Sequence, residues 1–428
     1  MTDFSCRTGP TFLDGVLLVA AAIPDAGLVF RGSSCVDERV RQSLRPHGGA
    51  GCLETLEHGG RLVLTMDPYS VSVMGTEERV ARGVEALVAR GGIRLVLLAT
   101  LSRYHLTGER LGPLAGNLDA RLPDVDVQAL STRLLARDHH DAFRAFYAGL
   151  AARLVAQGLE TPIPGTVGIL GAPWLRDGGD SRGDIEELTR LVEGLGLTCS
   201  GVLLDGRPST TFAPVAGADT LVAFPDAADA AEILAGATGA GLLRCAVPVS
   251  LDDCGAWLLE LARRTGREAR GQTLVEDELR RVVPLLDSVV PGALLGRRAI
   301  VAATAEWLPS LVRCLQEDLG MVVTDALART RRGSLEDSWT GPATLHPDAS
   351  VDQLNAAIDA ARTRGGVDVI IGSNWERNAL EAAHRTIPFV EFGYPQQRST
   401  FLRSTPHLGY SGVLTWAERL LAAVKSVP

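Results

Sequence analysis

Short runs of apolar residues recur along the chain, and a stretch with helical periodicity follows each of them. Most of the runs are continuous rather than alternating, which is typical of strands buried on both faces in a parallel sheet. In the intervening stretches apolar residues recur at helical spacing, as in Ile185–Leu195, and Gly196 then favours a helix end. The expected strands are 27–31, 61–66, 94–100, 124–127, 166–170, 198–204, 220–224, 241–246, 298–303, 321–324, 367–371 and 388–392.

The alternation of strands and helices continues through the whole chain and predicts an α/β fold. Loop signals at Thr161–Gly165 and at Pro291-Gly292 each come shortly before a new strand. In doubly wound sheets ligands bind beyond the carboxyl ends of strands, so functional residues should directly follow strands. We expect three stacked Rossmann-like domains with parallel sheets, at 1–162, 163–294 and 295–428.

Composition narrows the classes of function. The chain has 428 residues, of which 46% are hydrophobic and 22% are charged, as in an ordinary globular protein. A formal net charge of −9, with no basic block, argues against a nucleic-acid surface. The apolar run Val16–Pro24 is too short to span a bilayer, and no basic region precedes it. We therefore expect a cytoplasmic protein that binds neither nucleic acid nor membrane.

Several familiar motifs are missing from the sequence. Neither a dinucleotide fingerprint nor a P-loop is present, which disfavours nucleotide binding by this chain. His139-His140 precedes an expected helix and predicts a solvated helix start rather than a metal pair, because no third ligand is near in sequence. The seven cysteines include no CxxC pair, so they do not form a secreted disulfide framework. We expect core packing for Cys199, Cys245, Cys254 and Cys314.

Two cysteines in the first part of the chain have a more informative setting. Cys6 precedes a predicted helix, and Cys35 lies in a Gly/Ser turn directly after a predicted strand. Backbone N–H groups and helix N-termini favour the anionic thiolate, which is the form that an iron–sulfur cluster needs. Spacing alone leaves open, and slightly favours, simple packing of Cys35 in a tight turn.

The order of motifs along the chain resembles the component 1 family of nitrogenase-like proteins. That family includes the subunits of the molybdenum–iron protein, its cofactor-assembly scaffold pair and the light-independent protochlorophyllide reductases. Each motif is loose, but their order and spacing together are fairly specific and run nearly end to end. The matching segments are Leu28–Cys35, Leu64–Glu78, Ala99–Leu111, Thr166–Gly171, Asp180–Gly196, Gly296–Val301, Asp368–Ser373, Ile387–Pro395 and Leu408–Val413.

Departures from the family pattern indicate the type of subunit. Ser102 stands at the family's third cysteine position, Arg31 replaces a histidine, and Glu109-Arg110 replaces an Asp-Asp pair. The strand end Val222–Pro225 lacks the cysteine that anchors the catalytic cofactor in the alpha subunit of the molybdenum–iron protein. The chain therefore resembles a beta-type or scaffold-partner subunit.

The resemblance implies that Cys6 and Cys35 hold part of an iron–sulfur cluster of the 4Fe–4S or 8Fe–7S type, with Ser102 as a weaker oxygen ligand. A 4Fe–4S cluster takes four ligands, so a partner chain would complete it. That partner would be an alpha-type paralogous subunit in a heterodimer or α2β2 heterotetramer, although a homodimer giving two cysteines each would also suffice. An ATP-dependent iron protein would supply the electrons.

Alternatives to an electron-relaying subunit stay open at this stage. One is a non-catalytic scaffold for metal-cofactor assembly, and another is a cluster-free binding protein whose cysteines are core residues. The substrate is open among dinitrogen, a tetrapyrrole double bond and a carbon–sulfur bond. Weaker candidates for a role in the site are Cys52 as a ligand, His105 for proton or substrate contacts, and Glu376 at a predicted strand end.

Overall fold

The computed structural model describes residues 10–32, 40, 56, 59–66, 77–100, 111–130, 138–171, 179–329, 335 and 339–425. These residues divide into two compact units, which are described separately. The amino-terminal unit contains residues 10–171 and 200–244, and the carboxy-terminal unit contains residues 179–199 and 245–425.

The amino-terminal unit begins with a four-stranded parallel sheet in the order β2-β1-β3-β4. Strands β1 and β3 are buried along their whole length, as their continuous apolar sequences predict. The strands are β1 Ala26–Gly32, β2 Leu62–Met66, β3 Leu95–Thr100 and β4 Asp126–Leu130. The helices are α1 Phe12–Ala21, α4 Glu77–Val88, α5 Leu111–Arg121 and α6 His139–Gln157.

Helices α4 and α5 bury their apolar sides in one core cluster with β1, β3 and β4, which includes Val29, Val84 and Leu118. Helix α1 is buried on all sides and packs against α6. Gly15 permits that close packing, because a Cβ at this position would lie 2.3 Å from the carbonyl oxygen of His139.

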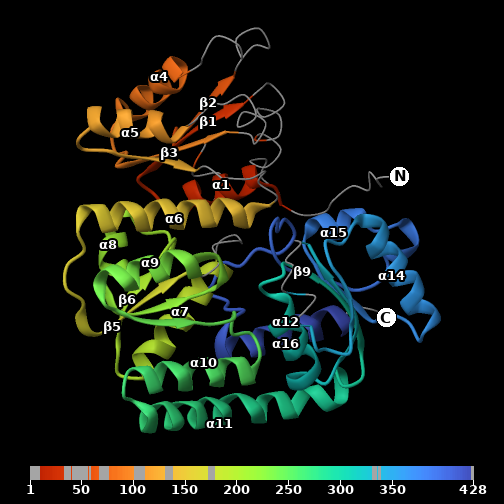
Figure 1. The fold of residues 1–428 in the computed structure, drawn as a ribbon. Coiled ribbons are helices and arrows are strands. Elements are labelled where there is room, and N and C mark those ends of the chain that lie inside the picture. The colour runs from red at the N-terminus through yellow and green to blue at the C-terminus, as the bar shows by residue number, and fades with distance from the viewer. Residues whose placement is uncertain are drawn as a thin grey trace. The chain divides into compact units, whose positions relative to one another are not determined.

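Apart from Thr198 and Cys199 at the start of β6, the same unit contains the strands of a second parallel sheet, in the order β6-β5-β7-β8. Helix α9 covers strands β7 and β8 and also contacts α6 (Figure 1). The elements are β5 Ile163–Leu170, β6 Thr198–Val202, η2 Ser209–Thr211, α8 Phe212–Ala216, β7 Ala218–Ala223, η3 Pro225–Ala227, α9 Ala228–Thr238 and β8 Gly241–Arg244.

The carboxy-terminal unit contains a five-stranded parallel sheet in the order β11-β10-β9-β12-β13. Its strands are β9 Arg298–Ala303, β10 Val322–Ala328, β11 Thr344–His346, β12 Val369–Gly372 and β13 Phe389–Glu391. Its helices are α7 Gly179–Gly194, α10 Leu251–Arg264, α11 Glu268–Ala293, α12 Leu308–Arg313, η4 Cys314–Asp318, α14 Val351–Thr363, α15 Asn374–Ala379, η5 Ala382–His384 and α16 Gly409–Lys425.

The long helix α11 runs alongside α10 and contacts the C-terminal helix α16 (Figure 1). Helix α16 also contacts α7. The carboxylate of Asp184 on α7 accepts the backbone N–H groups of His407 and Leu408 at 2.6 and 3.0 Å, just before α16 begins. This buried carboxylate therefore satisfies backbone groups that precede the helix and fixes α7 against its start.

The fold confirms the expected α/β class with parallel sheets, and every expected strand is present with shifts of a few residues at its ends. Strand β11 was not expected, because its three residues at a sheet edge form no apolar run. The strands of each sheet fall within one of the three predicted domains, although the domain boundaries themselves stay a prediction. Among the described helices, none is long and apolar enough to cross a membrane.

Candidate functional site

The carboxyl ends of β1, β2 and β3 form one edge of the first sheet, called here the first-sheet edge. Gly32 at the end of β1 pairs with Met66 of β2, and Arg31 pairs with Thr100, the last residue of β3. The Thr100 hydroxyl donates a hydrogen bond to the Arg31 carbonyl oxygen at 3.3 Å. The ends of these three strands therefore lie side by side in register at the first-sheet edge.

The first residues of α1 lie toward the first-sheet edge. The chain reverses between Ala21 and Ala26, where the Ala26 N–H binds the Ile23 carbonyl at 3.0 Å. Helix α1 packs on β1 and runs antiparallel to it. The first residue of α1 therefore lies toward the carboxyl end of β1. The carbonyl of Pro10, just before α1, accepts the N–H of His139 at 3.3 Å and fixes this point against α6.

The predicted cluster ligands lie outside the described residues. In sequence, Cys6 precedes Pro10 by four positions, Cys35 follows β1 by three, and Ser102 follows β3 by two. Cys52 and His105 also lie outside the described residues. The described chain thus gives the points from which these segments depart, and the ligand assignments stay predictions.

One charged side chain belongs to the first-sheet edge itself. Arg31 is 2% exposed. A buried guanidinium needs negatively charged or hydrogen-bonding groups around it. Arg31 has a partner within the protein, so its charge does not by itself indicate an anionic cofactor at this edge.

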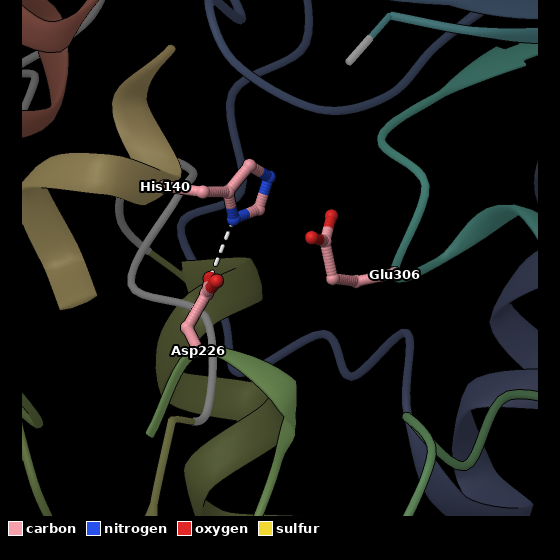
Figure 2. A group of neighbouring side chains, drawn as sticks. All are labelled: His140, Asp226 and Glu306. Atoms are coloured by element: carbon pink, nitrogen blue, oxygen red, sulfur yellow. Dashed lines mark hydrogen bonds and ion pairs between the residues drawn. The ribbon is translucent and has the colours of Figure 1, made fainter. Parts of the chain in front are cut away.

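A buried histidine–carboxylate pair lies in the amino-terminal unit at the end of β7. The Nδ1 atom of His140 lies 2.5 Å from the Asp226 carboxylate, which also accepts the Arg144 guanidinium at 3.1 Å (Figure 2). Glu306, also labelled in Figure 2, belongs to the other unit. The carboxylate fixes the orientation of the imidazole, the usual arrangement for a histidine that holds or moves a proton.

This pair corrects one expectation. Helix α6 begins at His139, where the sequence predicted a helix start, and Asp138 is its N-cap, but both histidines are 1% exposed rather than solvated. Helix α6 packs on η3, which carries Asp226. Asp226 lies 86 residues after His140, and the available signal was an aspartate two residues after a predicted strand.

Burial also raises the pKa of two residues near this pair. Asp138, whose carboxylate caps α6 through the His140 and Asp141 N–H groups, has a pKa that burial raises above its ordinary value. Tyr147, one turn further along than Phe143, is fully buried, and burial raises the pKa of its hydroxyl so that it stays protonated. The α6 start is therefore a region of low polarity in which charges depend on specific partners.

Glu376 follows β12, as predicted, but it is 2% exposed and engaged in structural contacts. One carboxylate oxygen accepts the Ser373 hydroxyl at 2.6 Å and its N–H at 2.7 Å, closing a capping box on α15. The other lies 3.0 Å from Nε of Arg329, which is equally buried. The buried ion pair with Arg329 therefore compensates the charge of Glu376, and no ligand is needed for this.

The four cysteines of the described chain match the expected core role to different degrees. Cys254 and Cys314 are fully buried, and burial raises the pKa of both thiols well above the ordinary value. Cys245 is half-buried, and burial raises its pKa to about 12. Cys199 is also half-buried and accepts a hydrogen bond from the Thr189 hydroxyl at 3.9 Å. Because a metal ligand must be a thiolate, the three raised pKa values disfavour ligation by these residues.

A pH effect on stability follows from Asp318, next to Cys314. Its carboxylate accepts the Leu251 N–H at 2.9 Å, and burial raises its pKa from 3.8 to about 7. Since the folded chain holds this proton more tightly, stability should fall from about pH 4 to about pH 7, by up to about 1.4 kcal/mol per pH unit. Asp318→Asn keeps an acceptor without the charge and should flatten that slope. Urea unfolding at several pH values tests this, and an unchanged slope in the variant would refute it.

A cavity of about 780 Å³ lies at the opposite edge of the first sheet, beside the amino ends of β3 and β4. Arg153 lines it and is paired with Asp119 at 3.1 Å and with Asp126. Ligands of doubly wound sheets bind at carboxyl ends, so this cavity does not coincide with the predicted cluster position.

Comparison with known proteins agrees with this architecture of three parallel sheets. The family model for the nitrogenase component 1 type oxidoreductase matches residues 12–425. The chain belongs to that family. A search of curated proteins finds no match.

Solved structures show the same fold. "Nitrogenase Cp1 at pH 6.5" is similar with a TM-score of 0.75 and 14% identity, over 99% of this chain and 94% of that one. "Nitrogenase Cp1 at pH 5" gives a TM-score of 0.74 and 13% identity, over 100% and 90% of the two chains. At these identities the likeness establishes the fold, and the chemistry depends on individual residues.

Proposed function

We propose that this chain is a beta-type subunit of a cytoplasmic nitrogenase-like reductase complex and helps to hold an iron–sulfur cluster at a subunit interface. Family membership and the component 1 fold support an oxidoreductase of this general type. An alpha-type subunit would complete the complex as a heterodimer or α2β2 heterotetramer, and an ATP-dependent iron protein would deliver electrons.

The observation that carries the proposal is the common edge from which the candidate ligand segments leave. The start of α1 lies toward the first-sheet edge, and β1 and β3 end there side by side. In the sequence, Cys35 and Ser102 follow the ends of β1 and β3 by three and two positions, and Cys6 precedes the first residue of α1 by six. Residues this close along the chain to neighbouring strand ends can meet in one site.

In the proposed site, the thiolates of Cys6 and Cys35 would hold the cluster, which when bound supplies one-electron transfer. The buried strands β1 and β3 exclude water from the sheet beneath. Because two cysteines are too few for a cluster, the partner chain would supply the remaining ligands.

A scaffold role in cofactor assembly is the second candidate. Its support is the end of β7, where Phe224 precedes η3 and no cysteine is present to anchor a catalytic cofactor. A scaffold would keep the interfacial cluster but pass on a metal cofactor instead of completing turnover.

Anaerobic co-purification with the genomic neighbours, followed by addition of the iron protein, MgATP and dithionite, tests the proposal. A subunit of a reductase should show an ATP-dependent change in its visible and EPR spectra, followed by substrate reduction. Spectral change without turnover would favour the scaffold. A colourless complex that contains no iron would contradict both.

A further inference from the structure

His384 lies in η5, the short helical turn that precedes β13, and each of its two ring nitrogens faces an oxygen atom. Nδ1 lies 3.0 Å from Oδ1 of Asn355, and Nε2 lies 2.9 Å from Oδ1 of Asp359. Both of these residues belong to α14. The imidazole is 1% exposed, so water has little access to take the place of either oxygen.

Hydrogen bonds fix the orientation of the Asn355 side-chain amide. Its Nδ2 group donates to the carbonyl oxygens of Val351 and Ala379 at 3.2 and 3.1 Å, and its Oδ1 atom accepts the Glu381 N–H at 3.1 Å. The reverse orientation would place the amide nitrogen against that N–H and the amide oxygen against two carbonyls. The atom that faces Nδ1 of His384 is therefore an acceptor.

Asp359 sets the same requirement at the other ring nitrogen. Its side chain is 64% exposed, and an exposed carboxylate is ionised at neutral pH and can only accept hydrogen bonds. A neutral imidazole carries one N–H group, whereas an imidazolium carries two. A neutral His384 would thus leave one buried nitrogen lone pair against an oxygen, which is costly. The protonated ring satisfies both contacts.

The charged partner of the ring is Asp359. In the described part of the chain, no other charged side chain of α14, α15, β13 or the segment around η5 forms a hydrogen bond or ion pair with it. Some of these side chains pair elsewhere, such as Glu376 with Arg329 and Arg364 with Asp325. The full set of other charged residues there is Asp352, Arg362, Arg364, Glu376, Arg377, Glu381, Arg385 and Glu391.

We propose that His384 stays protonated at neutral pH and acts as a proton-dependent clamp between η5 and α14. The His384 carbonyl accepts the Ile387 N–H at 3.1 Å, and the Pro388 carbonyl accepts the Ile370 N–H of β12 at 2.9 Å, so the clamped turn leads directly into the edge strand β13. Loss of the proton at alkaline pH breaks one of the two ring contacts and loosens this connection. The clamp lies in the carboxy-terminal unit and does not depend on the proposed cluster.

Solid-state nitrogen NMR of the full chain with isotope-labelled histidine, at about pH 7.5, reads the protonation state of the ring. At this pH only about a tenth of ordinary histidines carry the second proton. The signal missing in His384→Gln identifies the residue. We expect two protonated nitrogens in the wild type. In Asp359→Asn we expect a neutral ring with its proton on Nδ1, because an amide can turn its NH2 group toward Nε2. A neutral His384 in the wild type would overturn the proposal.

Glu381→Gln is the matched control, since it removes an exposed carboxylate beside η5 that does not contact the ring. His384 should stay protonated in this variant.

Urea unfolding at several pH values gives a second readout. Because the folded chain holds the proton more tightly, the stability that the clamp contributes is complete below about pH 6.5 and is lost as the pH rises further. The wild type should have a higher urea midpoint than His384→Gln, and this advantage should shrink from about pH 6 to about pH 9. If His384→Gln does not fold, the advantage over Asp359→Asn should shrink in the same way. An advantage that does not change with pH would also overturn the proposal.

Discussion

Replacement of Cys35 by alanine is expected to remove most of the iron and acid-labile sulfide from the anaerobically purified complex. The proposed cluster depends on few ligands from this chain, so the loss of one thiolate leaves a coordination position that the partner cannot fill. Metal analysis and the visible spectrum measure the loss. The same result is expected for Cys6→Ala.

The matched control for this prediction is Cys199→Ala. Cys199 is half-buried on β6 beside the Thr189 hydroxyl, in a different sheet from the proposed site. The iron content of this variant should equal that of the wild type. Equal iron in Cys35→Ala and Cys199→Ala would contradict the ligand assignment, provided that both variants show the same circular dichroism as the wild type.

The second large effect concerns the buried ion pair of the third sheet. Glu376→Ala should lower the free energy of unfolding of the carboxy-terminal unit by about 3–5 kcal/mol, because it leaves the Arg329 guanidinium buried without its carboxylate. Urea unfolding followed by tryptophan fluorescence measures this, since Trp416 is buried against Phe392 in the same unit.

Two further variants separate the effect of losing the ion pair from a nonspecific loss of stability. Replacing both members, as Arg329→Met with Glu376→Leu, should recover much of the loss, because apolar side chains of similar size replace a buried pair at little cost. Glu381→Ala removes an exposed carboxylate five residues away and should change stability by less than about 0.5 kcal/mol. A double variant as unstable as Glu376→Ala would contradict the interpretation.

The sequence predicted the sheets because their strands are buried on both faces. Continuous apolar runs such as Leu95–Thr100 carry that information locally. Strand β11 was not predicted because Thr344–His346 forms a strand through its pairing with β10 and its composition gives no strand signal.

Contacts between distant segments could not be predicted in the same way. The burial of His140 depends on Asp226, and the fixing of α7 depends on His407, which lies 223 residues after Asp184. The sequence marks such residues only as polar side chains near element ends.

The candidate site was also predicted only in its local features. The strand ends at Gly32 and Thr100 were predicted to within one residue, and the structure brings them side by side. The roles of Cys6, Cys35 and Ser102 rest on the family resemblance and on this shared edge, and they stay predictions.

Anomalous diffraction at the iron absorption edge, from crystals of the anaerobically purified complex, tests the central claim most directly. The account predicts an anomalous peak within bonding distance of the Sγ atoms of Cys6 and Cys35, with the remaining ligands supplied by a neighbouring subunit. Both sulfur atoms free of metal, in crystals of an iron-containing complex, would contradict it.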